Sequence, residues 1–412
     1  MRILFFEPDI SGHRREHLNT LIGYINSHNL SGEFIFVVHS DFEARTDLVA
    51  QITIDRLPAR EDPSSQKGEN ILTRSFRTFR LANHYAKKHK AEHVCFLNFN
   101  DVQFALALKR TKYSISGLLF KPFARRGKNT ASQKLVWLRK YLQTFLYIRN
   151  RQIHQLFVFN DSAAVGYLNR IFHTGIFTMV PDPVTILNPE PGFDVREQFG
   201  IPGGKKIFLH IGSLLKRKGT LDILEALKYL SEEELSRFVL IIVGHADEEM
   251  DKAIRTYPPQ PLPQTGRGYA PRMTRTTDPL PDRGRGPGGG YVKLASNVFY
   301  QNAFLPPSIF KSFIDQCDLI LVPYRDSESS SGIAGHAFAA GKPLLAVRRG
   351  LLGEMIEEFG TGVFIEECGA VSIAEGIRQA LYSELAGKIS ERFLQIYTQE
   401  AFAEKLIGST LR

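Results

Sequence analysis

Cysteine is scarce in this chain of 412 residues, which has three at wide spacings: Cys95, Cys317 and Cys368. An odd number spaced in this way fits neither a disulfide framework nor a zinc site, and it favours a reducing cytosol. Long apolar runs are also missing, since stretches such as 238–243 are strand-sized and a membrane span needs about 20 residues. The first apolar run ends in Glu7 and Asp9, too early for a signal peptide. We therefore expect a cytoplasmic protein, either soluble or peripheral on the cytoplasmic face of a membrane.

Acidic side chains are missing from residues 102–160, which contain 12 basic ones. Within this block, residues 134–149 have a helical period with an apolar stripe: Leu135, Leu138, Leu142, Phe145 and Leu146. The pattern suits docking on an anionic membrane surface, where each nearby cation contributes about 1 kcal/mol. It equally suits an amphipathic helix whose stripe faces a core. Because no recognised binding module accompanies the charge, we expect no nucleic-acid partner.

Strand-sized apolar runs alternate with helical patterns, which predicts an α/β fold of parallel sheets flanked by helices. Turn residues at 188–192 predict a boundary. We expect two Rossmann-like domains, 1–190 and 200–385, facing each other across a ligand-binding cleft, and a C-terminal helix at 386–412 that packs back on the first domain. The expected strands include 3–6, 34–38, 93–97, 155–159, 177–180, 206–211, 238–243, 298–301, 319–322, 343–347 and 362–365.

Residues 258–290 break this alternation with 8 prolines, 7 glycines and 5 arginines in 33 residues. The segment has no apolar period, so we expect a disordered insertion in the second domain. A connection of a few residues would suffice at this point, and we expect nothing catalytic to depend on the segment.

An acidic residue and a loop of small residues open a short helix late in the chain. Backbone N–H groups at such a helix start bind phosphate when no bulky side chain covers them. A carboxylate repels phosphate, so we assign Glu328 to neutral hydroxyls next to the anion. The expected ligand is a sugar joined to a diphosphate, held by Glu328, Ser329, Ser330, Ser331 and Gly332.

A glycine turn and a basic loop follow the strand expected at 206–211. Gly212 lets the backbone approach a ligand, and Lys218 can neutralise a diphosphate from the same side as the helix start at Gly332. Together with the residues at 243–245 and 317–323, these motifs follow the order and spacing of one known family.

The series resembles the nucleotide-sugar glycosyltransferases with two Rossmann domains (GT-B), specifically glycosyltransferase family 4, over about residues 200–385. The resemblance implies transfer of a hexose-type sugar from a nucleoside diphosphate to a hydroxyl acceptor with retention of configuration, the acceptor being a glycan, a polysaccharide or a lipid-linked precursor. It implies that Lys218 and Glu328 are catalytic. By the resemblance, Lys218 would hold the diphosphate, Glu328 the sugar hydroxyls and the amides of 329–332 the nearer phosphate. Taken with the neighbouring loops, the expected donor contacts are Gly12, His13, Gly212, Ser213, Lys218, His245, Glu328, Ser329, Ser330, Ser331, Gly332 and His336.

Two positions depart from the pattern of that family. Ser213 stands where it has arginine, and His336 stands where its Glu, seven residues, Glu motif has the second glutamate. A neutral imidazole accepts one hydrogen bond where a carboxylate clamps two ribose hydroxyls, so His336 is either a donor contact or a packed helix residue. The departures leave two rivals: a catalytically degenerate partner of another transferase, and a sugar-nucleotide epimerase.

The loop after the first strand has several interpretations. His13, Glu16 and His17 match an inverted zinc-protease pattern, although no third acidic ligand follows at a suitable spacing. Alternatively, Gly12 and His13 approach the donor phosphates or the acceptor, or the loop is a plain helix start. We expect no metal and no cofactor, because no Asp-x-Asp motif lies in a suitable loop and the helix start with its lysines supplies the positive charge.

Asn100 and Asp101 follow the strand expected at 93–97, so they lie at the carboxyl end of the first sheet. They are expected either to contact the acceptor or to cap the next helix.

Overall fold

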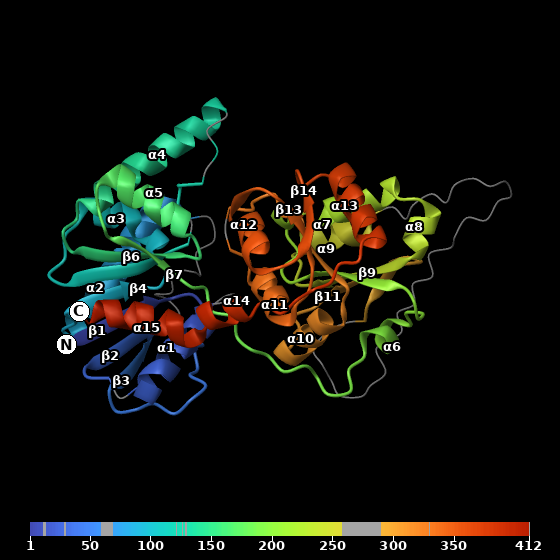
Figure 1. Ribbon diagram of the computed structural model, residues 1–412. Helices are drawn as coiled ribbons and strands as arrows, with labels where there is room; N and C mark the ends of the chain where they lie inside the picture. The colour runs from blue at the N-terminus through green and yellow to red at the C-terminus, as the bar shows by residue number, and fades with distance from the viewer. Residues whose placement is uncertain are drawn as a thin grey trace. The chain divides into compact units, whose positions relative to one another are not determined.

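The computed structural model describes residues 1–10, 14–28, 30–58, 69–120, 122–125, 127, 130–257, 290–328 and 330–411. The chain forms two compact units, Met1–Pro183 with Ile396–Arg412, and Val184–Gln395 (Figure 1). Each unit contains a seven-stranded sheet with flanking helices, so the predicted α/β class is confirmed. The insertion expected at 258–290 lies outside the described residues except for Gly290.

The sheet of the first unit is parallel throughout, in the order β3-β2-β1-β4-β5-β6-β7. Its strands are β1 (Arg2–Glu7), β2 (Glu33–Val38), β3 (Ile52–Arg56), β4 (His93–Phe96), β5 (Ser114–Leu119), β6 (Ile153–Phe159) and β7 (Phe177–Val180). Its helices are α1 (Arg14–His28), α2 (Ile71–Lys88), the 3₁₀ turn η3 (Phe99–Asp101), α3 (Gln103–Leu108), α4 (Ala131–Ile148), α5 (Ser162–Phe172) and α15 (Gln399–Thr410).

Both faces of this sheet are buried, which explains why β1 is apolar without alternation. Ile3 and Phe5 pack in a core cluster with side chains of α1 and α15, and Leu4 and Phe6 pack in a second cluster with side chains of α2 to α5. Helix α15 contacts α1 and β7. The C-terminal helix therefore packs back on the first unit, as the sequence predicts.

The sheet of the second unit has the order β10-β11-β9-β8-β12-β13-β14, and only the β10–β11 pair is antiparallel. Its strands are β8 (Lys206–Ile211), β9 (Phe238–Gly244), β10 (Val292–Ala295), β11 (Val298–Asn302), β12 (Leu319–Val322), β13 (Leu344–Val347) and β14 (Gly362–Ile365). Its helices are α6 (Val195–Phe199), η4 (Lys216–Lys218), α7 (Thr220–Ala226), η5 (Leu227–Tyr229), α8 (Glu232–Ser236), α9 (Glu248–Arg255), α10 (Pro307–Gln316), α11 (Gly332–Ala340), α12 (Gly350–Phe359), α13 (Ala370–Tyr382) and α14 (Glu391–Ile396).

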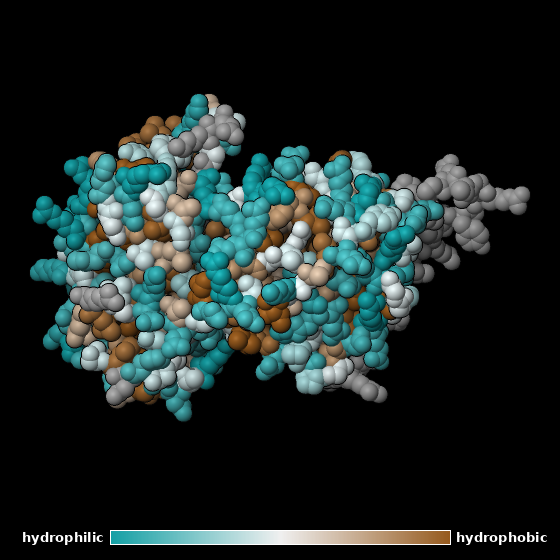
Figure 2. All heavy atoms as spheres, in the orientation of Figure 1, coloured by the Kyte–Doolittle hydropathy of each residue, from teal (hydrophilic) through white to brown (hydrophobic). Residues whose placement is uncertain are grey.

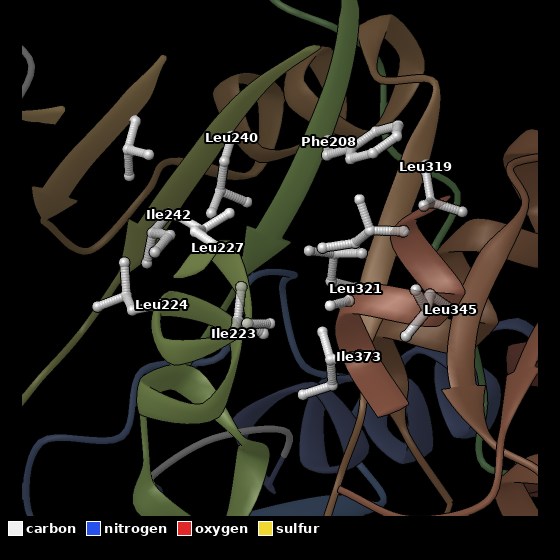
Figure 3. Close-up of a cluster of buried hydrophobic side chains, with 14 of the residues drawn as sticks. Phe208, Ile223, Leu224, Leu227, Leu240, Ile242, Leu319, Leu321, Leu345 and Ile373 are labelled. Atoms are coloured by element: carbon white, nitrogen blue, oxygen red, sulfur yellow. The ribbon is translucent and has the colours of Figure 1, made fainter. Parts of the chain in front are cut away.

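A buried apolar cluster holds the flanking helices of the second unit on its central strands. Ile223 and Leu224 of α7 lie beside Ile242 of β9, and Ile373 of α13 belongs to the same cluster (Figure 3). This packing positions the loop between β8 and α7, where the predicted lysine lies.

The strand order reverses once in each sheet, at β1 and β4 in the first and at β8 and β12 in the second. In open α/β sheets, ligands bind at the carboxyl ends of the strands that flank such a reversal. The loops that follow these four strands are therefore the places to look for a site.

Helix α4 corrects one interpretation of the basic block. Thr130 caps its N-terminus in a capping box with Gln133. The five residues of the predicted stripe, from Leu135 to Leu146, are exposed, while Tyr147 on another face is buried in the core. The core-facing interpretation of the stripe is therefore wrong.

Candidate functional site

The loops after β8 and β9 approach each other at backbone distance. A Cβ atom at Gly244 would lie 1.7 Å from the carbonyl oxygen of Gly212, and Gly244 has a φ of +151°. The Gly212 N–H donates to the Val243 carbonyl at 3.1 Å, and the Leu214 N–H donates to the His245 carbonyl at 2.8 Å. Glycine at 244 thus sets the shape of the loop that carries Gly212.

Lys218 projects from η4 toward this glycine turn. Its Nζ lies 3.7 Å from the position that a Cβ at Gly212 would occupy, and 5.2 Å from the ring centroid of Tyr324. Burial disfavours the charged ammonium, and together with Arg217 it lowers the pKa of Lys218 to about 8. No carboxylate of the described residues forms an ion pair with Lys218, so an anionic ligand would stabilise the charged form of this side chain.

The N-terminus of α11 lies beside the same lysine. The Ser331 hydroxyl caps α11 by accepting from the Ala334 N–H at 3.5 Å, and it donates to the Tyr324 hydroxyl at 3.4 Å. The side chain of Ile333 lies 3.2 Å from the Cβ position of Gly212. Gly212, Lys218 and the start of α11 are therefore brought together at the carboxyl end of the second sheet.

The other described residues expected to bind the donor lie on the loops after β8, β9 and β12 and on α11. Glu328 is exposed and follows the buried Ser327, whose carbonyl accepts from the Leu352 N–H at 3.1 Å. Ser213 and His245 are exposed, and Ser330 and Gly332 are half-buried. The ring of His336 lies edge-on to Phe310 of α10, with centroids 5.0 Å apart. Packing of this kind is what the alternative interpretation of His336 expects.

Three of the predicted donor residues, Gly12, His13 and Ser329, lie outside the described residues.

At the carboxyl end of the first sheet, the sequence interpretation missed a cluster of charged residues. Glu7 ends β1 and is buried, and its Oε1 accepts from the Asp9 N–H at 3.1 Å. Arg14, the first residue of α1, contacts Asp9 at 2.5 Å and Glu7 at 3.5 Å. Burial raises the pKa of Glu7 to about 8 against the opposing effect of Arg14. The other oxygen of Glu7, Oε2, has no hydrogen-bond partner in the described part of the chain.

Asp101 belongs to the same cluster, on the loop that follows β4. It accepts from Arg74 of α2 and from the Asn98 amide, each at 2.8 Å. Burial raises the pKa of Asp101, and Arg74 and Arg14 oppose this shift. We call Glu7, Asp9, Arg14, Arg74, Asn98 and Asp101 the acidic network.

Neither Asn100 nor Asp101 caps the following helix, because α3 begins after Val102 without a side-chain cap. The Asn100 side chain accepts instead from the Phe120 N–H at 3.0 Å. Asn100 therefore ties the loop after β4 to the end of β5.

His17 has a structural environment rather than that of a metal ligand. Its ring stacks between Phe159 and Phe402, with centroid distances of 5.4 and 4.9 Å, and its Nε2 lies 3.3 Å from Asp182. Among the residues that the structure describes, no group of three or more His, Cys, Asp or Glu side chains is arranged to hold a metal ion.

Comparison with known families matches one part of the second unit. Residues 193–258 match the family described as Glycosyl transferases group 1. The matched stretch includes β8, Gly212, Lys218 and β9, and it ends at the first residue of the proline- and glycine-rich segment. No curated protein matches the sequence.

Several solved structures share the fold of the whole chain at low identity. Sucrose-phosphate synthase from Thermosynechococcus elongatus has a TM-score of 0.66 at 14% identity, over 100% of this chain and 98% of its own. The UDP-forming α,α-trehalose-phosphate synthase from Burkholderia xenovorans has a TM-score of 0.66 at 11% identity, over 100% of both chains. HepE from Anabaena, in complex with UDP-glucose, has a TM-score of 0.62 at 13% identity, over 100% of this chain and 99% of its own. The shared fold and the local family match support a glycosyltransferase of the GT-B type.

Proposed function

We propose that this protein transfers a hexose-type sugar from a nucleoside diphosphate to a hydroxyl group of a glycan, a polysaccharide or a lipid-linked precursor, with retention of configuration. The observation that carries the proposal is the convergence of Lys218, Gly212 and the N-terminus of α11 at the reversal point of the second sheet. The ammonium group of Lys218, the glycine turn at Gly212 and the backbone amides at the start of α11 together match the charge and shape of a diphosphate.

In this proposal the diphosphate is both the group that is held and the group that leaves. The bond between the sugar's anomeric carbon and the phosphate oxygen breaks, and negative charge develops on that oxygen. Lys218 and the amides at the start of α11 stabilise this charge in a partly desolvated place, where such contacts are strongest. Glu328 accepts hydrogen bonds from the sugar hydroxyls and orients the ring.

Retention requires the acceptor oxygen to bond to the anomeric carbon on the face that the diphosphate leaves. The departing phosphate oxygen takes the acceptor's proton, so atoms and charge balance without a protein base. Lys218 and α11 supply the positive charge, so no metal or cofactor is part of the scheme.

The acidic network of the first unit is suited to hydroxyl groups rather than to phosphate. Oxygens of the Glu7 carboxyl group and of the Asp101 carboxylate can accept hydrogen bonds, and Arg14 and Arg74 hold these side chains in place. We assign acceptor recognition to this network, with Asp9 and Asp101 as its partly exposed acids.

Similar structures indicate where a donor search should begin. HepE is described with UDP-glucose, and the trehalose-phosphate synthase is described as UDP-forming. UDP-sugars are therefore the first donors to test on this protein.

The experiment is a turnover and binding assay of the purified chain with a panel of nucleoside diphosphate sugars. The wild type is expected to release nucleoside diphosphate from one donor, and Lys218→Met is expected to lower kcat/KM for that donor by about 100-fold. Lys252→Met is the matched control, because Lys252 is an exposed lysine of α9 in the same unit. Equal losses in the two variants would remove Lys218 from the mechanism.

Two outcomes of the assay point to the rival functions. Nucleotide binding without turnover of any donor would favour a degenerate binding protein. Conversion of a donor into another nucleotide sugar without an acceptor would favour an epimerase.

A further inference from the structure

Helix α4 presents a continuous row of apolar side chains to solvent. Within the described residues, the exposed fractions of the row are Leu135 68%, Leu138 47%, Leu142 49%, Phe145 39% and Leu146 45%. We call these five residues the α4 stripe. Figure 2 shows apolar surface gathered over α4, which extends from the first unit in Figure 1. Several large exposed apolar residues on one helix face mark an interaction surface.

The stripe is exposed because other faces of α4 hold the helix on the unit. Trp137 packs edge-on against Phe123 at 5.5 Å, and Tyr141 stacks on Phe172 at 5.0 Å. Tyr147 is 1% exposed. The aromatic residues thus anchor the helix on the unit, and the leucines of the stripe face solvent.

Basic side chains border the stripe. At 3.6 residues per turn, Lys134 and Arg139 fall on its two borders, and both are exposed. Arg149 lies over the ring of Phe145 at 5.0 Å. Helix α3 contacts α4, and three more exposed cations follow it: Lys109, Arg110 and Lys112.

No acidic residue of the surrounding sequence offsets this charge. Residues 102–160 contain none, and the first acids on either side are already engaged. Asp101 pairs with Arg74 at 2.8 Å, and Asp161 pairs with Arg125 at 2.6 Å. The surface around the stripe is therefore apolar and cationic.

We propose that α4 docks the first unit onto an anionic lipid bilayer, with its axis along the membrane surface. The leucines and Phe145 enter the boundary between headgroups and acyl chains, while Lys134 and Arg139 stay at the level of the lipid phosphates. The 18 residues of α4 extend about 27 Å, enough for a surface helix. Within the described parts of the chain, no helix combines the length and apolarity needed to cross a bilayer.

This docking goes beyond the proposed sugar transfer and does not depend on it. A partner protein would be expected to place acidic side chains opposite the cations of α4. An anionic bilayer instead provides phosphates for the cations and an apolar layer for the stripe. The apolar stripe of α4 matches the acyl-chain layer of a membrane interface, and its basic borders match the layer of lipid phosphates.

The test is sedimentation of the full chain with vesicles of phosphatidylcholine alone or mixed with phosphatidylglycerol. We expect binding to the mixed vesicles that falls with added salt. Leu138→Ser combined with Leu142→Ser is expected to weaken binding by about tenfold or more, because membrane affinity scales with the inserted apolar area. Lys134→Gln combined with Arg139→Gln is expected to weaken it several-fold and to reduce its salt dependence.

Val371→Ser combined with Ile389→Ser is the matched control, since both residues are exposed apolar residues of the second unit. Trp137 is the single tryptophan of the chain, so its emission shows whether α4 stays packed in each variant. Unaltered vesicle binding by a folded leucine variant would overturn the proposal. So would an absence of binding by the wild type at low salt, or a dimer that the leucine changes dissociate, which would identify a second copy as the occupant.

Discussion

The two sheets place different ionisable groups at the same topological position. Where the first sheet reverses, Glu7 lies at the end of β1 and Asp9 and Asp101 lie on the loops, all three in a partly buried network with arginines. Where the second sheet reverses, the loops carry Lys218, a bare glycine turn and the start of α11. Burial shifts the two key groups in opposite directions, raising the pKa of Glu7 to about 8 and lowering the pKa of Lys218 to about 8.

The two sheets share a reversal of strand order at the place where ligands bind in open α/β sheets, whereas the loop residues at that place differ between them. Burial brings both groups toward neutrality, because desolvation disfavours either charge. An anionic ligand would stabilise the charged form of Lys218, and a neutral hydroxyl ligand would leave Glu7 protonated. Under the proposed function, the first unit would therefore hold the uncharged acceptor and the second unit the charged donor.

The largest expected effect concerns the backbone of the cationic loops. Gly244→Ala would put a Cβ 1.7 Å from the Gly212 carbonyl oxygen at a φ of +151°, so we expect a loss of about 4 kcal/mol in unfolding free energy. Gly203→Ala is the control, because nothing lies within 4 Å of its Cβ position. Calorimetry of the two variants measures the difference. Equal stability of Gly244→Ala and Gly203→Ala would mean that the loops after β8 and β9 move apart at little cost in free energy.

The next effect concerns the acidic network and its dependence on pH. The folded pKa of Glu7 is raised from 4.5 to about 8, so its contribution to stability is present below pH 4.5 and is lost as the pH rises through 8. We expect Glu7→Gln to be about 4 kcal/mol more stable relative to wild type at pH 9 than at pH 5.

Thermal unfolding followed by Trp137 emission measures this effect in the first unit, which contains the single tryptophan. Glu16→Gln is the control, because Glu16 is a half-buried acid of α1 that pairs with Arg45. A Glu7→Gln variant whose stability follows the wild type at every pH would show that Glu7 is charged at pH 7.

The third prediction tests whether Glu328 contributes to catalysis without contributing to the stability of the fold. We expect Glu328→Gln to lower kcat by about 100-fold, because the amide is a weaker acceptor for the sugar hydroxyls that the carboxylate orients. Its exposure predicts an unchanged melting temperature. Glu384→Gln is the control, since Glu384 is an exposed acid of the same unit. Full activity of the Glu328 variant would exclude it from the mechanism.

The smallest effect is a titration of Lys218. With a pKa of about 8, the side chain is mostly charged at pH 7 and mostly neutral at pH 9, so we expect the affinity for UDP to fall about tenfold over this range. Calorimetric titration with UDP gives the affinities. Lys218→Arg should bind UDP with a flat profile, because arginine stays protonated. An equally steep profile in that variant would assign the titration to another group.

The donor residues at the second sheet were partly predictable from the sequence. Gly212, Lys218 and Gly332 follow strands with clear apolar runs, and parallel strands bring their carboxyl ends to one side of a sheet. The strands expected at 206–211, 238–243 and 319–322 are confirmed as β8, β9 and β12. The roles of the donor residues stay predictions.

The acidic network was largely missed, because its members are distant in sequence. Arg74 lies in α2 and Glu7 ends β1, and only the placement of α2 and of β4 beside β1 brings them near Asp101. Strand β5 was not among the expected strands either. It contains Gly117, where a Cβ would lie 2.8 Å from the Phe96 carbonyl oxygen, so close packing leaves no room for a side chain. The glycine interrupts the apolar run by which a strand is predicted.

The order of apolar runs and turn glycines, a local property of the chain, was enough to determine two Rossmann-like units and the loops that share an end of each sheet. Only the tertiary structure decided which face of α4 is packed, because the aromatic residues Trp137 and Tyr141 pack on the unit while Leu138 is exposed. The shifted pKa values of Glu7 and Lys218 were decided in the same way, since burial depends on neighbours that sheet order assembles from distant parts of the sequence.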